Sequence, residues 1–162
     1  MQSIRVETRI AAPADRCFLL SLGVELHLSN MAHTGERAVA GVTQGLIGLG
    51  ETVTWQGRHF GCRVKHKALI TQYQRPHHFR DVMLQGMFRS FEHDHYFEPL
   101  TATDTVMRDD LRFAAPLGPL GRLAEAAVLR RYLERLLIAR NQLIRGVAEA
   151  PEEVWRPFLP DR

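Results

Sequence analysis

The sequence contains few of the residues and motifs that mark common chemistry. It has two cysteines among its 162 residues, Cys17 and Cys62, and no Cys-x-x-Cys pair. A disulfide framework and a cysteine-based zinc site are therefore excluded, and we expect both thiols to be reduced in apolar surroundings. No apolar run approaches the ~18 residues that span a membrane, and the N-terminus lacks the apolar segment of a signal peptide. We expect a cytoplasmic protein with no stable membrane insertion.

Positive charge is in slight excess but is not concentrated. The formal net charge is +3 and the pI is about 9.2, yet the arginines are scattered, and no basic block has aromatic residues between its charges. Proteins that bind nucleic acids gather basic residues on one face or along one helix. We therefore expect no nucleic-acid partner.

Two familiar site motifs are also missing. Residues 45–50 are rich in glycine, but their order is not that of the dinucleotide fingerprint, and a strand rather than a helix is expected to follow them. Ser21, Ser29 and Ser90 do not lie in the strand-turn-helix context of a nucleophilic serine. We expect no cofactor and no hydrolase triad.

Alternation of apolar and polar residues predicts seven strands. Residues Ser3–Ile10 alternate with a period of two, as in a half-buried strand. Six further segments have strand composition, and the turns between them are too short for a crossover helix, so neighbouring strands should be antiparallel. These six are Glu36–Ala40, Glu51–Arg58, Cys62–Tyr73, His78–Leu84, Met87–Glu98 and Thr105–Ala114.

Two short helices are predicted between the first and second strands. Pro13 fits the first turn of a helix and Asp15 complements its positive end, which predicts a helix over Pro13–Leu20. Gly23 separates this helix from a second one over Val24–Asn30.

A long helix is predicted over Gly118–Glu149. Its first half is apolar almost all round, whereas its second half gathers apolar residues on one face, which Arg140 interrupts. That face contains Leu129, Tyr132, Leu133, Leu136, Leu143, Ile144 and Val147. Residues 150–162 contain three prolines and are predicted to form an extended tail. We therefore expect one domain over residues 1–149, followed by this tail.

The predicted order is a strand, two short helices, six antiparallel strands and a long helix, which is the α+β helix-grip order of a seven-stranded curved sheet wrapped around a C-terminal helix. With this order the chain resembles the START-type, polyketide cyclase and ligand-binding (SRPBCC) superfamily, and in particular its small bacterial cytoplasmic members. The segments that carry the resemblance are Gly35–Gly41, Val53–Trp55, Arg58–Gly61, Gly86–Phe97, Met107–Asp109 and Pro116–Gly121.

The resemblance implies an apolar pocket between the sheet and the long helix. It does not imply one activity, because the superfamily includes lipid carriers, hormone receptors, cyclases and oxygenase subunits. The expected partner is a small apolar molecule, lipid-like or aromatic, and the resemblance leaves the oligomeric state open.

The strand pattern itself indicates which side chains face the helix. In the strand Met87–Glu98, His93 and His95 share a face with Phe91 and Phe97. If Phe97 pairs with Thr105 across the following hairpin, His95 lies opposite Met107 and His93 lies opposite Asp109. The same alternation applied to the other strands and the helix predicts the remaining pocket residues. The full set is Val53, Trp55, His66, Asp81, Met83, Phe91, His93, His95, Met107, Asp109, Leu111, Phe113, Leu136 and Arg140.

The polar members of this set admit three interpretations. They can satisfy one another as buried pairs, because unpaired polar groups in a core are costly. They can instead orient one end of a ligand, or His93 can act as a general acid or base with Asp109 fixing its tautomer. Residues His93 and His95 also have the spacing of metal ligands on a strand, but no second motif supplies a third ligand, so we expect no metal.

Arg140 has two interpretations of its own. Its stem can lie along apolar surface with the guanidinium in water, or the guanidinium can bind a carboxylate, that of Asp81, Asp109 or a ligand.

Three functions are consistent with the sequence. The first is carriage or sensing of a small, largely apolar ligand. The second is a cyclase or dehydratase acting on a polyketide-like substrate, with His93 and Asp109 moving protons. The third is a protein-interaction module that uses the basic outer face of the long helix, made of Arg130, Arg131, Arg135 and Arg145.

Overall fold

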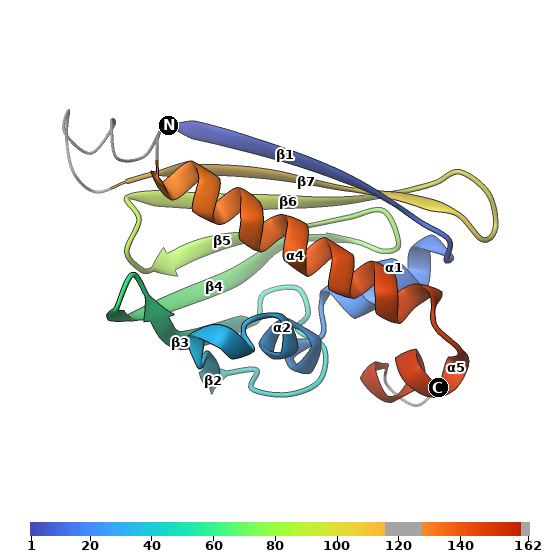
Figure 1. Cartoon of the computed structure of the whole chain (residues 1–162), viewed down its shortest axis with the longest axis horizontal. Coiled ribbons are helices and arrows are strands. Elements are labelled where there is room, and N and C mark those ends of the chain that lie inside the picture. The colour runs from blue at the N-terminus through green and yellow to red at the C-terminus, as the bar shows by residue number, and fades with distance from the viewer. Residues whose placement is uncertain (116–127, 160–162) are drawn as a thin grey trace.

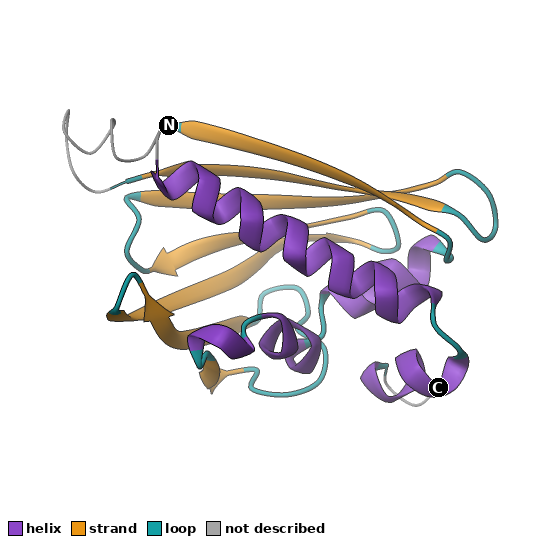
Figure 2. Cartoon of the chain, viewed as in Figure 1, coloured by secondary structure: helices purple, strands orange, loops and turns teal. Residues whose placement is uncertain are grey.

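The computed structural model describes residues 1–115 and 128–159. A single antiparallel sheet curves around the helix α4, and α1 and α2 lie against the same helix (Figures 1 and 2). Its seven strands follow the order β1-β7-β6-β5-β4-β3-β2. The predicted helix-grip architecture is therefore confirmed.

All seven predicted strands are present, and alternation places their apolar residues on the face toward α4. The strands are β1 (Gln2–Ile10), β2 (Arg37–Gly41), β3 (Thr52–His59), β4 (Cys62–Gln74), β5 (His78–Gln85), β6 (Ser90–Pro99) and β7 (Thr105–Ala114).

The helices also follow the sequence pattern closely. The first two are α1 (Ala14–Ser21) and α2 (Val24–Asn30), followed by a short 3-10 turn η1 (Ala32–Thr34). The described part of the long helix is α4 (Arg130–Glu149); the residues predicted to form its first half lie largely outside the described part. Side chains of Arg130, Arg131, Arg135 and Arg145 are exposed on α4. No helix among the described residues has the length and apolar character needed to cross a membrane.

Residues 152–158 are helical, which corrects the extended tail that the prolines predicted there. Residues Glu152–Trp155 form the helical turn α5, and Arg156–Phe158 form the 3-10 turn η3. Pro151 and Pro157 sit at the starts of these turns, where the missing N–H is not needed. Trp155 packs against the main core. The guanidinium carbon of Arg16 lies 4.2 Å from the centre of the Trp155 ring. Apolar contact thus overrides the proline signal.

The core has a main cluster between the sheet, α1 and the second half of α4. Phe18 of α1 is fully buried at its centre and makes edge-to-face contacts with Tyr73, Phe79 and Phe97. A smaller cluster joins Leu133 and Leu137 of α4 to β1 and β7. Between the two clusters the packing leaves room for a cavity.

One residue is inserted at each of three places where the pairing register shifts. Val39 has no partner between Ala38 and Ala40 of β2. Thr71 is the extra residue in β4, and Leu84 is the extra residue in β5. Such β-bulges bend a strand and increase its twist, so they help the sheet to curve around α4.

The predicted register of the β6–β7 hairpin is wrong by two residues. Phe97 pairs with Met107, and His95 pairs with Asp109. The turn is shorter than assumed, since Pro99 already pairs with Thr105 and the backbone N–H of Leu100 donates to the carbonyl of Asp104. A shift of two residues leaves every side chain on its predicted face, so the inward set is unchanged.

The two cysteines differ from each other. Cys17 is fully buried, as predicted, and burial raises the pKa of its thiol to about 11. Cys62 is exposed at the start of β4, which corrects the expected apolar surroundings. It follows the tight turn at Phe60 and Gly61, where both residues have positive φ.

Candidate functional site

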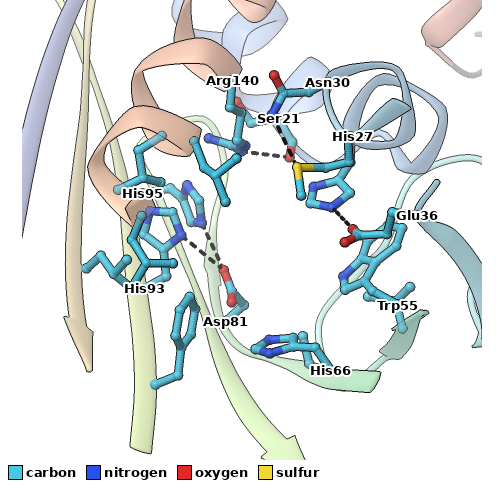
Figure 3. A pocket seen from close by; sticks show the side chains of 18 of the residues that line it. Ser21, His27, Asn30, Glu36, Trp55, His66, Asp81, His93, His95 and Arg140 are labelled. Atoms are coloured by element: carbon cyan, nitrogen blue, oxygen red, sulfur yellow. Dashed lines mark hydrogen bonds and ion pairs between the residues drawn. The ribbon is translucent and has the colours of Figure 1, made fainter. Parts of the chain in front are cut away.

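A cavity of about 230 Å³ lies between the concave face of the sheet, α2 and α4 (Figure 3). Most of its lining is apolar, and polar side chains occupy two of its walls and part of its floor. The predicted pocket residues that line it are Val53, Trp55, His66, Asp81, Phe91, His93, His95, Leu111, Leu136 and Arg140.

Four predicted pocket residues do not line the cavity. Met107 and Phe113 are fully buried within the two core clusters. Met83 packs its sulfur against Gly86, on the far side of the bulge at Leu84. Asp109 is also fully buried, but it lies directly behind His93 and His95 and so belongs to the site without touching the cavity.

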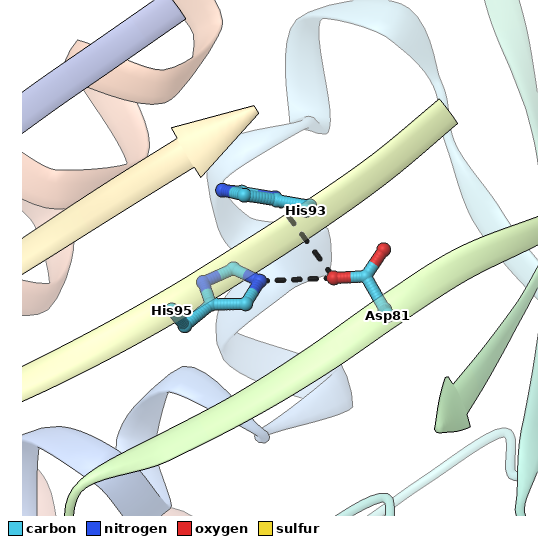
Figure 4. A group of neighbouring side chains, drawn as sticks. All are labelled: Asp81, His93 and His95. Atoms are coloured by element: carbon cyan, nitrogen blue, oxygen red, sulfur yellow. Dashed lines mark hydrogen bonds and ion pairs between the residues drawn. The ribbon is translucent and has the colours of Figure 1, made fainter. Parts of the chain in front are cut away.

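The first polar wall is the Asp81 cluster, which comprises Asp81, His93, His95, Asp109, Arg140 and Asn141. The pairing of β5, β6 and β7 brings it together, because Asp81 is opposite His93 and His95 is opposite Asp109. His95 Nε2 lies 2.9 Å from Asp81 Oδ1, and His93 Nδ1 lies 3.9 Å from the same atom (Figure 4). The opposite ring nitrogens, His93 Nε2 and His95 Nδ1, lie 2.9 and 2.8 Å from Asp109 Oδ1. Each imidazole is thus held between two carboxylates.

The helix α4 closes this cluster from the other side. Arg140 Nη1 lies 3.4 Å from Asp109 Oδ1, and Arg140 Nη2 donates to the carbonyl of Ser21. Asn141 Nδ2 donates to Asp109 Oδ2 at 2.7 Å. Of the two interpretations of Arg140, the structure shows the carboxylate contact, and its side chain is only 12% exposed. Asn141 is fully buried and was missed, because asparagine inside an apolar helix face gives no distinctive signal.

Burial and hydrogen bonding set the charges in the Asp81 cluster. Burial alone would raise the pKa of Asp109, but the contacts from His93 and His95 hold it well below its usual range. The pKa of Asp81 is lowered in the same way, by the hydrogen bond from His95 and the nearby imidazoles, against the effect of burial. Burial and the neighbouring His95 lower the pKa of His93. Both carboxylates are therefore ionised near neutral pH, while His93 is neutral.

Three residues of this cluster have the donor types of a metal site. One ligand atom from each of Asp81, His93 and His95 lies within 4.8 Å of the others. Among the described residues, this is the group whose spacing could hold a metal ion. Two imidazoles and one carboxylate suit a divalent transition metal. Asp81 and His95 also hydrogen-bond to each other, whereas His93 Nε2 and His95 Nδ1 lie close to Asp109 but have no well-aligned hydrogen bond among the described residues.

The second polar wall is the Glu36 cluster, made of His27, Glu36, His59 and Tyr132. His27 Nε2 lies 2.7 Å and His59 Nε2 3.4 Å from the Glu36 carboxylate, and His59 Nδ1 lies 2.6 Å from the Tyr132 hydroxyl. The ring of His27 stacks on Trp55, with ring centres 4.1 Å apart. Burial would raise the pKa of Glu36, but the hydrogen bonds from the two histidines lower it to about 2.

The polar residues of this wall were not predicted as pocket residues from the sequence. They come from α2, from the residue before β2, from the end of β3 and from α4, so no short motif contains them. Only Trp55, which alternation placed inward, pointed to this region.

His66 lies on the cavity floor between the two walls (Figure 3). Its ring makes an edge-to-face contact with Phe91, and no hydrogen bond to it is present among the described residues. Burial lowers its pKa. His66 therefore presents a neutral imidazole, with one donor and one acceptor, to whatever occupies the cavity.

Comparison with solved structures supports the fold. No family model matches the chain, and no curated protein matches it. An aromatase/cyclase, Zhui from Streptomyces sp. R1128, is 17% identical with a TM-score of 0.69, over 91% of this chain and 93% of that one. A START superfamily protein from Mycobacterium smegmatis is 13% identical with a TM-score of 0.68, over 91% and 97% of the two chains.

A third neighbour is norcoclaurine synthase from Thalictrum flavum, which is 16% identical with a TM-score of 0.63, over 88% and 86% of the two chains. These proteins differ in what their names describe, and the low identities show a shared fold alone. The chain has the START-like helix-grip fold.

Proposed function

We propose that this protein binds and carries, or senses, a small and largely apolar ligand in the cavity between the sheet and α4. The observation that supports this proposal best is the lining of the cavity, which is mostly apolar and whose polar residues are those of the two walls together with His66, Ser21 and Asn30. A mostly apolar cavity with a few fixed polar groups is the usual form of a small-molecule site.

The size of the cavity limits the ligand. Its volume of about 230 Å³ lies just below the ~300–1,000 Å³ common for drug-sized ligands. A compact molecule of one or two rings fits this volume better than a long acyl chain. Aromatic side chains such as Trp55 and Phe91 offer flat contact surfaces to such a molecule.

One observation favours catalysis as a second candidate. The neutral imidazole of His93 lines the cavity, and its other nitrogen lies 2.9 Å from Asp109. A neutral imidazole backed by a carboxylate can accept a proton from a bound substrate. In that case the protein is an enzyme of the cyclase or dehydratase kind, and the cavity orients the substrate while His93 moves protons.

Ligand binding is tested first with the protein as purified. Native mass spectrometry followed by organic extraction asks whether a small molecule co-purifies, and calorimetric titration with naphthalene asks whether the cavity takes a compact apolar probe. We expect binding by the natural chain. We expect no binding by Leu136→Trp, because Leu136 lines the cavity and the larger ring fills it.

The matched control is Ile138→Trp, which places the same ring on the exposed face of α4, where Ile138 is 44% exposed. It should bind naphthalene as the natural chain does. Failure of the folded natural chain to bind or retain any apolar molecule would contradict the proposal. If a co-purified molecule is changed by the protein and His93→Gln binds it without changing it, the catalytic candidate is supported.

A further inference from the structure

The two polar walls face each other across the cavity. Figure 3 shows the carboxylates of Asp81 and Glu36 on opposite sides of the open space, with His66 below it. Asp81 lies on β5, and Trp55 beside the Glu36 cluster lies on β3, two strands away. Trp55 pairs with His66 of β4, and Asp81 pairs with Ile70, four residues further along the same strand. Two strand spacings of ~4.8 Å and four residues of ~3.3 Å place the two backbone positions roughly 16 Å apart. A molecule that fills the cavity therefore meets a carboxylate at each end.

Each carboxylate retains the capacity to accept another hydrogen bond. An ionised carboxylate has about four acceptor positions. Asp81 uses Oδ1 for the two histidines, and no hydrogen bond to Oδ2 is present among the described residues. Glu36 receives His27 on one oxygen and His59 on the other, the latter at the longer distance of 3.4 Å. A donor on a ligand can be added at either wall without displacing a protein group.

The charges at both walls select the kind of group that binds there. Asp81 and Glu36 are ionised and accept hydrogen bonds, so a ligand carboxylate or phosphate would be repelled. Arg140 is the one lysine or arginine among the described lining residues, and Asp109 and the Ser21 carbonyl already occupy its guanidinium. A positively charged group would have to lose its water in a mostly apolar cavity, which is costly. An uncharged donor, above all a hydroxyl group, therefore suits both walls.

We infer that the ligand of this cavity is an uncharged, compact molecule with a hydroxyl group at each end of an apolar body. One hydroxyl donates to Asp81, and the other donates to Glu36. This inference rests on the proposed binding function and narrows it to one class of ligand, and it assigns the Glu36 cluster as a second polar subsite.

Three matched probes test it: naphthalene, 2-naphthol and naphthalene-2,6-diol. They share one apolar body and carry no hydroxyl, one hydroxyl and two opposed hydroxyls. Titration calorimetry should show that each hydroxyl tightens binding by about tenfold, as expected for a hydrogen bond to a charged acceptor. Quenching of Trp55 fluorescence gives an independent signal, because Trp55 lines the cavity.

Single and double substitutions separate the two walls. Glu36→Gln and Asp81→Asn keep the shape of each side chain and remove its charge, and each should weaken the diol by several-fold. Either single change should leave 2-naphthol within about twofold, because a molecule with one hydroxyl can turn to the intact wall. The double variant should weaken 2-naphthol as well. Circular dichroism and thermal unfolding confirm that the variants are folded.

The possible outcomes separate the inference from the proposed function. If naphthalene binds but the diol binds no tighter than 2-naphthol, the cavity binds apolar molecules and the inference is wrong. It is equally wrong if Glu36→Gln leaves the affinity for the diol unchanged. If none of the three probes binds the folded natural chain, the proposed function fails and the inference fails with it.

Discussion

Strand β6 presents two buried carboxylate networks, one on each face, and they are built differently. On the outer face Asp94 contacts His78 and receives two parallel hydrogen bonds from Arg80 and one from Arg112. On the inner face Asp109 of β7 contacts His93 and His95, whose side chains are almost fully buried. The outer network contains two arginines that reach water, Arg80 and Arg112, whereas the two imidazoles of the inner network line the cavity.

The difference shows how a stabilising network can be told from a candidate site. Arginine stays charged and matches a carboxylate in a fixed fork, so the Asp94 network is complete without a ligand. The imidazoles of His93 and His95 line the cavity, whereas His78, Arg80, Asp94 and Arg112 of the outer network do not. A molecule in the cavity can therefore contact the inner network directly, and it cannot contact the outer one.

The largest expected effect comes from removing the inner carboxylate. Asp109→Asn should lower the free energy of unfolding by roughly 3–5 kcal/mol, because it leaves Arg140 and two buried imidazoles without their partner. Asp94→Asn should cost only about 1–3 kcal/mol, since the side chains of Arg80 and Arg112 are 25% and 41% exposed and can turn to water. Urea unfolding measures the free energy of unfolding of both variants. Equal losses would contradict the proposed difference between the inner and outer networks.

Acid should destabilise the cavity walls in two steps. The pKa values of His66 and His93 are lowered in the folded chain, so the unfolded chain binds more protons and stability falls as the pH drops below about 6.5. Carboxylates with lowered pKa values add a second loss below about pH 4.5. For Glu36 a pKa lowered from 4.5 to about 2 corresponds to about 3 kcal/mol.

Unfolding free energies measured from pH 7 to pH 3 check this prediction. Glu36→Gln should flatten the curve below pH 4.5, and His66→Phe should flatten it just below pH 6.5. A curve of unchanged slope in both variants would show that these groups keep ordinary pKa values.

The next smaller effect on stability is expected from removing one arginine from each network. Arg140→Leu should cost about 1.5–3 kcal/mol, the range for a hydrogen bond to a charged group, because its side chain is only 12% exposed beside Asp109. Arg112→Leu should cost less than ~1 kcal/mol, because Arg80 still holds Asp94. Arg140→Leu with unchanged stability would show that Asp109 does not need the guanidinium.

The smallest effect is expected on the outer face of α4. Arg135→Ala changes an exposed side chain and should alter stability by no more than ~0.5 kcal/mol. Binding of the naphthalene probes should also be unchanged. A large loss of function in this variant would favour the interaction-module hypothesis over a cavity function.

Much of the fold could be predicted because it depends on periodic patterns. Alternation along β6 and β7 places His93, His95 and Asp109 on one face whatever the register, provided that the shift is an even number of residues. The register itself depends on the hairpin turn, where the hydroxyl of Thr101 donates a hydrogen bond to the carboxylate of Asp104. The alternation of apolar and polar residues does not predict such local contacts.

The Glu36 cluster could not be predicted for a different reason. His27 lies on α2, Glu36 precedes β2 and His59 ends β3, so only the tertiary fold brings them to one wall. Asn141 was missed because one amide in an apolar helix face is also compatible with exposure. Sites assembled from single residues on several elements leave no periodic signal.

The three β-bulges mark positions where one residue could be deleted without changing the strand pairing on either side. Thr71, Val39 and Leu84 have no cross-strand partner, and removing one of them would straighten its strand without turning any neighbouring side chain to the opposite face. Val39 and Leu84 are 44% and 52% exposed at these unpaired positions. These two apolar side chains therefore mark where the sheet bends, and they give no reason to expect a docking surface there.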